Sequence, residues 1–106
     1  MGELNKDFVK VAETKDIQTT NMKAVEVSGE KICLANVEGK YYAIGNICTH
    51  EGGPLDEGTL EGYEVECPWH GSKFDFRTGK VTRPPANRPE STYEVKVEGN
   101  DILIRE

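Results

Sequence analysis

Short runs with an apolar or aromatic residue at every second position follow one another along most of the chain. A period of two is typical of β-strands, because successive side chains on a strand point to opposite faces of a sheet. Glycine-containing turn signals separate the runs. Only residues 13–20, ETKDIQTT, could be helical, and we expect a single turn there. The predicted strands are residues 8–13, 23–29, 31–39, 40–46, 63–67, 91–99 and 101–106.

Two pairs of these runs are predicted to form hairpins. Residues 32–45, ICLANVEGKYYAIG, are expected to turn at Glu38-Gly39-Lys40, and residues 92–106, TYEVKVEGNDILIRE, at Gly99-Asn100. Many short strands joined by regular turns predict an all-β fold, either a sandwich or a small barrel.

Two segments interrupt the alternation. Residues 46–58, NICTHEGGPLDEG, are rich in glycine, proline and acidic residues, and residues 83–91, RPPANRPES, contain three prolines. Proline lacks the N–H that a central strand must donate, so the second segment cannot be a central strand. We expect both segments to be loops on a rigid β scaffold, where functional groups are often placed.

Length and composition indicate one domain, residues 1–106. A hydrophobic fraction of 36% and a charged fraction of 30% are typical of a globule with a polar surface. No apolar run approaches the roughly 20 residues needed to cross a bilayer, and the first ten residues, MGELNKDFVK, lack the apolar core of a signal peptide. We therefore expect a cytoplasmic protein with no membrane contact, and a monomer.

The net charge of −6 argues against nucleic-acid binding, because no basic stripe is present to neutralise phosphates. An acidic surface favours a partner with a basic docking patch, mainly through association rate and orientation, or it serves solubility alone. Both interpretations remain open for the acidic residues near the first histidine: Glu51, Asp56 and Glu57.

The three cysteines point to a metal rather than to a disulfide framework. Their number is odd and the chain shows no secretion signal. Cys33 lies in the apolar run KICLANV and is expected to be a small buried core residue.

The other two cysteines are each paired with a histidine. Cys48-x-His50 is followed, after sixteen residues, by Cys67-x-x-His70, and these pairs use both histidines of the chain. Thiolate and imidazole are ligands that soft and borderline metals prefer. A zinc-stabilised β domain acting as a binding module is one interpretation. Zinc fingers, however, usually pair Cys with Cys and His with His, whereas one of each from each loop suits a two-iron cluster.

The segments CTHEGGPLDEG and CPWHGSKFDFRTGKV resemble the two cluster-binding loops of Rieske [2Fe–2S] proteins, and the chain is similar to the soluble ferredoxins of bacterial aromatic-ring-hydroxylating dioxygenase systems. The resemblance covers about Ala43 to Pro85. It implies that a Rieske cluster is bound by Cys48 and Cys67 on the inner iron and by His50 and His70 on the outer iron, near the surface. It also implies a β scaffold from residues 1–43 and 86–106, and a cluster-binding subdomain from residues 44–85.

Four further residues are expected around the cluster. Ser72 occupies the position of a hydroxyl donor to the cluster sulfur, whereas Phe74 stands where high-potential relatives have tyrosine, so a low potential within the Rieske range is expected. Trp69 either shields the second loop or the cluster edge, or is an ordinary packing residue. Trp69 and Gly53 stand where respiratory Rieske proteins have a disulfide, so no bridge can form. Pro84, with Pro85, resembles the proline-rich loop that covers the cluster.

The resemblance implies a one-electron carrier that receives electrons from a flavin-dependent reductase and passes them to a terminal oxygenase. We expect no catalytic residues, because both histidines are committed to the cluster and no nucleophile–base pair is evident. Two alternatives remain: the Rieske-type small subunit of an assimilatory nitrite reductase, and a general-purpose Rieske ferredoxin without an oxygenase partner.

Overall fold

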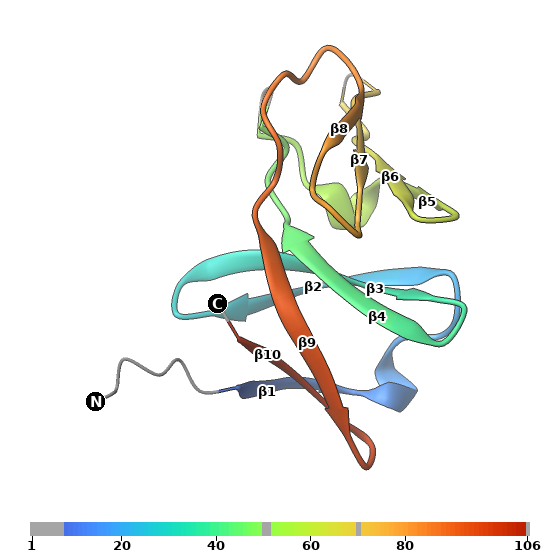
Figure 1. Cartoon of the computed structure of the whole chain (residues 1–106), viewed down its shortest axis with the longest axis vertical. Helices are drawn as coiled ribbons and strands as arrows, with labels where there is room; N and C mark the ends of the chain where they lie inside the picture. The colour runs from blue at the N-terminus through green and yellow to red at the C-terminus, as the bar shows by residue number, and fades with distance from the viewer. Residues whose placement is uncertain (1–7, 50–51, 70, 106) are drawn as a thin grey trace.

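The computed structural model describes residues 8–49, 52–69 and 71–105, and within them the regular secondary structure consists of β-strands and two short 3-10 turns (Figure 1). The predicted all-β fold is confirmed. The strands are β1 (Val9–Glu13), β2 (Asn21–Val27), β3 (Glu30–Val37), β4 (Lys40–Gly45), β5 (Thr59–Glu61), β6 (Glu64–Glu66), β7 (Lys73–Asp75), β8 (Val81–Arg83), β9 (Thr92–Glu98) and β10 (Asp101–Arg105).

The strands form two antiparallel sheets, which lie at opposite ends of the long axis of the molecule in Figure 1. The larger sheet has six strands in the order β1-β10-β9-β4-β3-β2. The smaller sheet has four strands in the order β5-β6-β7-β8 and is a simple meander. Because β4 leads into the small sheet and β9 returns from it, every residue between them is held by the two adjacent strands of the large sheet.

Strand β3 lies between two apolar cores. Its residues Ile32, Cys33, Leu34 and Ala35 are all fully buried. Alternate side chains of the strand face opposite sides, so Ile32 and Leu34 join one core with residues of β10, whereas Cys33 and Ala35 join a second core beneath the small sheet. This double burial explains why ICLA is continuously apolar instead of alternating.

Both predicted hairpins are present. Strands β3 and β4 are joined by Glu38 and Gly39, whose φ angles are +54° and +89°. Two successive positive φ values give the turn a twist that matches that of the strands. In the second hairpin, Gly99 has a φ of +61° between β9 and β10.

The short elements were predicted less well. The expected single helical turn is a 3-10 turn at Thr14–Asp16, but a second one, at Leu55–Glu57, was not expected. Strands β5, β7 and β8 were also missed, although the equally short β6 lies within the predicted strand of residues 63–67. In the described part of the chain, no helix is long and apolar enough to span a membrane.

Candidate metal centre

The same turn is built twice, once at each predicted ligand pair. In loop 1 (residues 46–58), the N–H of Cys48 donates to the carbonyl of Gly53 at 2.8 Å, and the N–H of Gly52 donates back to the carbonyl of Cys48 at 2.9 Å. In loop 2 (residues 67–72), Cys67 donates to Ser72 at 2.7 Å, and Gly71 donates back to Cys67 at 3.1 Å. Each turn therefore begins at a cysteine and is closed by bonds to the residues four and five positions later.

Glycine makes these turns possible. The fourth residue after each cysteine, Gly52 or Gly71, has a φ of +82° or +81°, a backbone conformation that is costly for residues with a Cβ. The sequence showed glycines near both pairs, and the structure shows that their positions in the two turns are equivalent.

The two turns bring Cys48 and Cys67 to the same buried place. Cys48 is 4% exposed and Cys67 is 2% exposed, and both belong to the core beneath the small sheet. Gly53 connects them, since its carbonyl binds the N–H of Cys48 and a Cβ built on it would lie 2.8 Å from Sγ of Cys67. Two thiols converging from separate turns suit a metal centre. His50 and His70 lie outside the described residues, so their role as ligands stays a prediction.

Asn46 anchors the start of loop 1 to its end. Its side chain donates to Oδ1 of Asp56 and accepts from the N–H of Asp56, both at 2.8 Å, and its carbonyl accepts from Leu55 at 2.8 Å. Asn46 is only 3% exposed. Of the acidic residues considered for docking, Asp56 is therefore part of the loop's internal structure, Glu57 is exposed, and Glu51 lies outside the described residues.

A third segment, residues 84–90, lies across both loops and is called the strap below. Thr49 in loop 1 donates its hydroxyl to the carbonyl of Arg88 at 2.7 Å. In loop 2, the hydroxyl of Ser72 accepts from the N–H of Ala86 at 2.9 Å. The strap thus binds loop 1 at the residue next to Cys48, and it binds loop 2 at Ser72, which closes the turn that begins at Cys67.

Comparison with known proteins identifies the family. The sequence profile of the family described as "Rieske [2Fe-2S] domain" matches residues 7–101. The chain belongs to the Rieske [2Fe–2S] family. The ferredoxin component of the naphthalene 1,2-dioxygenase/salicylate 5-hydroxylase systems of Ralstonia sp. is 36% identical over 102 residues, which are 96% of this chain and 98% of the relative.

Two solved Rieske structures are similar over nearly the whole chain. The ferredoxin of carbazole 1,9a-dioxygenase from Nocardioides aromaticivorans has a TM-score of 0.89 and 34% identity, covering 92% of this chain and 95% of the other. The ferredoxin in a complex of reduced oxygenase and oxidised ferredoxin of carbazole 1,9a-dioxygenase has a TM-score of 0.89 and 31% identity, covering 95% and 94%. The predicted family, fold and cofactor class are confirmed, and the zinc interpretation is not supported.

The Rieske cluster fits the residues that the structure describes. The inner iron needs two thiolates close together, and Cys48 and Cys67 would supply them from a buried position. Cys33, by contrast, lies in β3 with its Sγ 3.7 Å from Sδ of Met22, and burial raises the pKa of its thiol strongly. This confirms the prediction that Cys33 is a core residue.

The residues expected around the Rieske cluster differ in burial. Ser72 and Phe74 are fully buried, and because the Ser72 hydroxyl accepts from Ala86, its own proton stays available for donation. Pro84 is exposed, and the buried residues of the strap are Ala86 and Glu90. Trp69 is 55% exposed, which does not fit an ordinary core residue. The roles of all four toward the cluster stay predictions.

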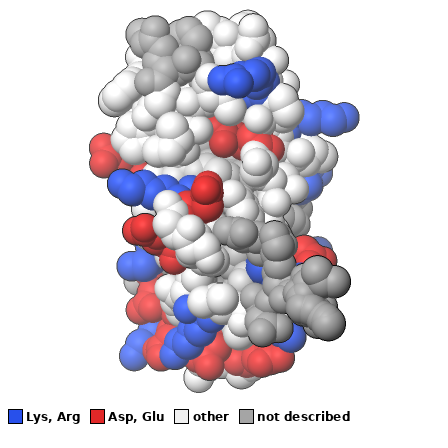
Figure 2. Space-filling view, turned by 90° about the vertical axis from the view of Figure 1, so that its left-hand side faces the viewer, with Lys and Arg blue, Asp and Glu red and all other residues white. Residues whose placement is uncertain are grey.

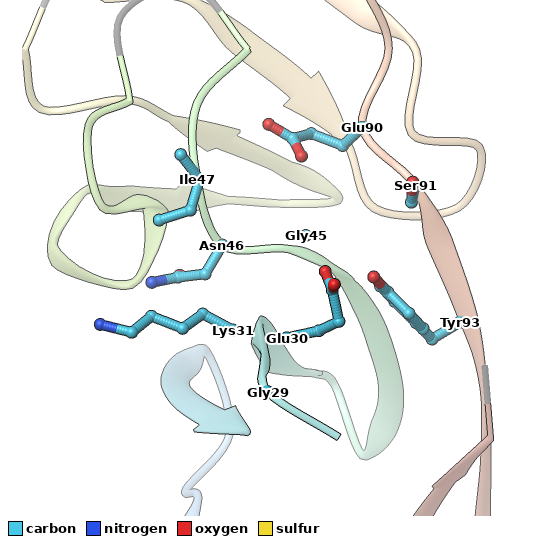
Figure 3. Close-up of a pocket in the computed structure, with 9 residues that line it drawn as sticks. All are labelled: Gly29, Glu30, Lys31, Gly45, Asn46, Ile47, Glu90, Ser91 and Tyr93. Carbon is cyan, nitrogen blue, oxygen red and sulfur yellow. The ribbon is translucent and has the colours of Figure 1, made fainter. Parts of the chain in front are cut away.

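Sequence reasoning missed Glu90, a buried carboxyl at the end of the strap. Figure 3 shows it above Gly45, beside a hollow lined also by Lys31 and Asn46, where the two sheets meet. Glu90 is 8% exposed, and among the residues that the structure describes its Oε2 has no hydrogen-bond partner. Burial raises the pKa of Glu90 to about 7, although a hydrogen bond from the backbone of Thr49 acts in the opposite direction. A glutamate in a proline-rich loop gives no signal in the sequence that it will be buried.

Proposed function

We propose that this Rieske protein is the ferredoxin component of an aromatic-ring-hydroxylating oxygenase system and carries one electron at a time. The observation that carries the proposal is the convergence of Cys48 and Cys67 from twin turns, in a chain that matches a ferredoxin component over nearly its full length. A flavin-dependent reductase would supply the electron and a terminal oxygenase would receive it. The relation to the oxygenase is supported by the similar ferredoxin whose structure is a complex with oxygenase.

The roles of the ligands follow from their chemistry and position. Cys48 and Cys67 would hold the inner iron in the buried core, and His50 and His70 would hold the outer iron, toward the partner. When bound, the cluster supplies a one-electron redox site at a potential higher than that of four-cysteine clusters, because neutral imidazoles leave it less negative. The protein side chains hold the cluster and keep water away from the thiolates.

We further propose that residues 44–85 form the cluster-binding subdomain and that residues 1–43 and 86–106 form its scaffold. The four-stranded sheet and both loops lie within residues 44–85, whereas the long strands of the large sheet lie almost entirely outside them. The protein is proposed to be monomeric and cytoplasmic.

The surface of the subdomain end offers apolar side chains for docking, beside exposed charged residues such as Arg83 and Arg88. Figure 2 shows one face of the molecule, on which acidic and basic side chains mingle over the large sheet, while basic side chains stand among uncharged ones at the end with the small sheet. Two large apolar side chains are exposed in the loops of that end: Ile47, 47% exposed, and Trp69, 55% exposed. A partner approaching this end would meet apolar surface close to the ligands.

Of the two alternatives, the nitrite reductase subunit is less well supported. All four predicted ligands are present in the chain, and the relatives above are named as ferredoxins. A general-purpose ferredoxin would have the same metal centre. The protein that accepts the electron therefore distinguishes an oxygenase ferredoxin from a general-purpose one. Reconstitution with a flavin reductase and a terminal oxygenase tests this, and electron transfer to the oxygenase is expected only when the ferredoxin is present.

The cluster itself is tested by replacing cysteines one at a time. Cys48→Ser and Cys67→Ser are expected to lose inorganic sulfide and the reduced-state spin-resonance signal, because each removes a ligand of the inner iron. The matched control is Cys33→Ala, which removes the third thiol from the same core and is expected to keep both signals. A wild-type protein that contains zinc and no sulfide would contradict the proposal.

A further inference from the structure

Trp69 and Gly53 are in direct contact across the boundary between the two loops. A Cβ built on Gly53 would lie 3.0 Å from both Cγ and Cδ2 of Trp69, closer than nearly all real contacts of a Cβ. The same Cβ would lie 2.8 Å from Sγ of Cys67. The indole therefore lies against the backbone of loop 1, next to the thiol of loop 2.

This contact is separate from the bonds that shape the loops. The backbone bonds from Cys48 and Gly52 close within loop 1, and those from Cys67 and Gly71 close within loop 2. The strap reaches each loop through a different residue, Thr49 or Ser72. The packing of Trp69 on Gly53 adds a direct contact from one loop to the other, at the cysteine end of both turns.

The exposure of Trp69 is consistent with a cover rather than a core residue. Trp69 is the single tryptophan of the chain, and it is 55% exposed while Gly53 beneath it is buried. A large aromatic ring with one face on backbone and the other in water excludes solvent from what lies below it. Sγ of Cys67 lies on the same side of Gly53 as the indole, because a Cβ built on this glycine would approach both of them.

We propose that Trp69 is a positioning residue that closes the joint between the two loops over Gly53 and keeps water from the Cys67 thiolate. The inference rests on the proposed function, because it assumes that the thiolate holds the cluster. Two consequences follow. Chelators and water reach the inner iron more slowly when the indole is in place. Reduction adds one negative charge, which water would stabilise, so the indole also lowers the reduction potential.

The test compares three variants of the cluster-loaded protein. Trp69→Ala is expected to lose iron to a chelator about ten times faster than wild type, which corresponds to about 1.4 kcal/mol, and to show a more positive potential by voltammetry. Trp69→Phe keeps an aromatic ring on Gly53 and is expected to restore most of both properties. Val97→Ala trims an exposed apolar residue, 44% exposed in β9, and is expected to behave as wild type.

Gly53→Ala tests the contact from the other loop. Gly53 is not in the positive-φ region, so an alanine acts through its Cβ, which must displace Trp69 or Cys67. Faster iron loss is expected, and adding Trp69→Ala to it should accelerate the loss by less than the product of the two single effects, because both disturb one contact.

The outcomes separate this inference from the proposed function. If wild type carries the cluster but Trp69→Ala matches it in iron loss and potential, or if the effects of Gly53→Ala and Trp69→Ala are fully additive, the cover role is wrong and the carrier function stands. If wild type carries no iron–sulfur cluster, the proposed function itself is wrong.

Discussion

At the scale of single residues, burial raises the pKa of two acidic groups, Cys33 and Glu90, with different results at physiological pH. Cys33 is fully buried, and the raised pKa of its thiol keeps it neutral at physiological pH, where it is a simple apolar residue. Glu90 is also buried, but its pKa of about 7 lies in the physiological range, so its charge changes under ordinary conditions. Its carboxyl therefore couples folding stability to pH.

The sign of that coupling follows from the direction of the shift. In the folded protein the pKa of Glu90 is raised from its ordinary value of 4.5 to about 7, so the folded state holds the proton more tightly than the unfolded chain. The contribution of protonated Glu90 to folding stability is fully present below pH 4.5 and is lost as the pH rises through about 7. We expect Glu90→Gln to reduce this loss by about 1–3 kcal/mol between pH 4.5 and 7.

Urea unfolding at a series of pH values measures the effect. The control is Glu26→Gln, which removes a carboxylate from an exposed position in β2. Parallel stability curves for wild type and Glu90→Gln over this pH range would show that Glu90 does not hold a proton in the folded protein.

At the scale of elements, the strap matters because it binds two loops that the sequence separates. The bond from Ala86 to Ser72 is buried, whereas the bond from Thr49 to Arg88 is exposed to solvent. Water can replace the exposed bond, but it cannot reach an orphaned N–H at Ala86, which is 3% exposed. The two ends of the strap are therefore expected to contribute unequally to stability.

Removing the two hydroxyls separately tests this difference. Ser72→Ala is expected to lower the free energy of unfolding by about 1–3 kcal/mol, because it leaves a buried N–H without an acceptor. Thr49→Val, which keeps the shape of the side chain, is expected to cost less than about 1 kcal/mol. Chemical denaturation of the loaded proteins gives both values, and equal losses would contradict the buried position of the Ser72 bond.

The elements also show where sequence reasoning succeeds. The hairpins at Glu38-Gly39 and Gly99-Asn100 were predictable, because alternation on both sides and turn residues between them are local signals. The short strands β5, β7 and β8 were not, because their pairing depends on neighbours and not on their own three residues.

At the scale of the whole molecule, the two cores share strand β3, and of the described residues the two predicted cysteine ligands lie in one core. Cys48 and Cys67 belong to the core beneath the small sheet, and the other core is formed by residues of the large sheet such as Leu34 and Ile104. A group that binds only the folded state stabilises the part of the protein that it contacts. Removing the cluster should therefore destabilise the small sheet and its core more than the large sheet.

Hydrogen exchange before and after chelation tests this expectation. We expect amides of β5 to β8 to exchange roughly ten times faster or more in the cluster-free protein, and those of β1, β9 and β10 to change little, because their core contains no ligand. A uniform increase over both sheets would show that the subdomain and its scaffold unfold as one unit.

The sequence by itself determined the strand-rich fold, the family, the cofactor class and the four candidate ligands. These depend on local patterns: alternation along a strand, and a cysteine and a histidine close together before glycine. Tertiary structure alone decided that the two cysteine turns are equivalent, that the strap joins them through Ser72 and Thr49, that Trp69 covers Gly53, and that Glu90 is buried. The bonds of the strap and the contact of Trp69 with Gly53 join residues distant in sequence, and the burial of Glu90 depends on packing, so no local pattern encodes them.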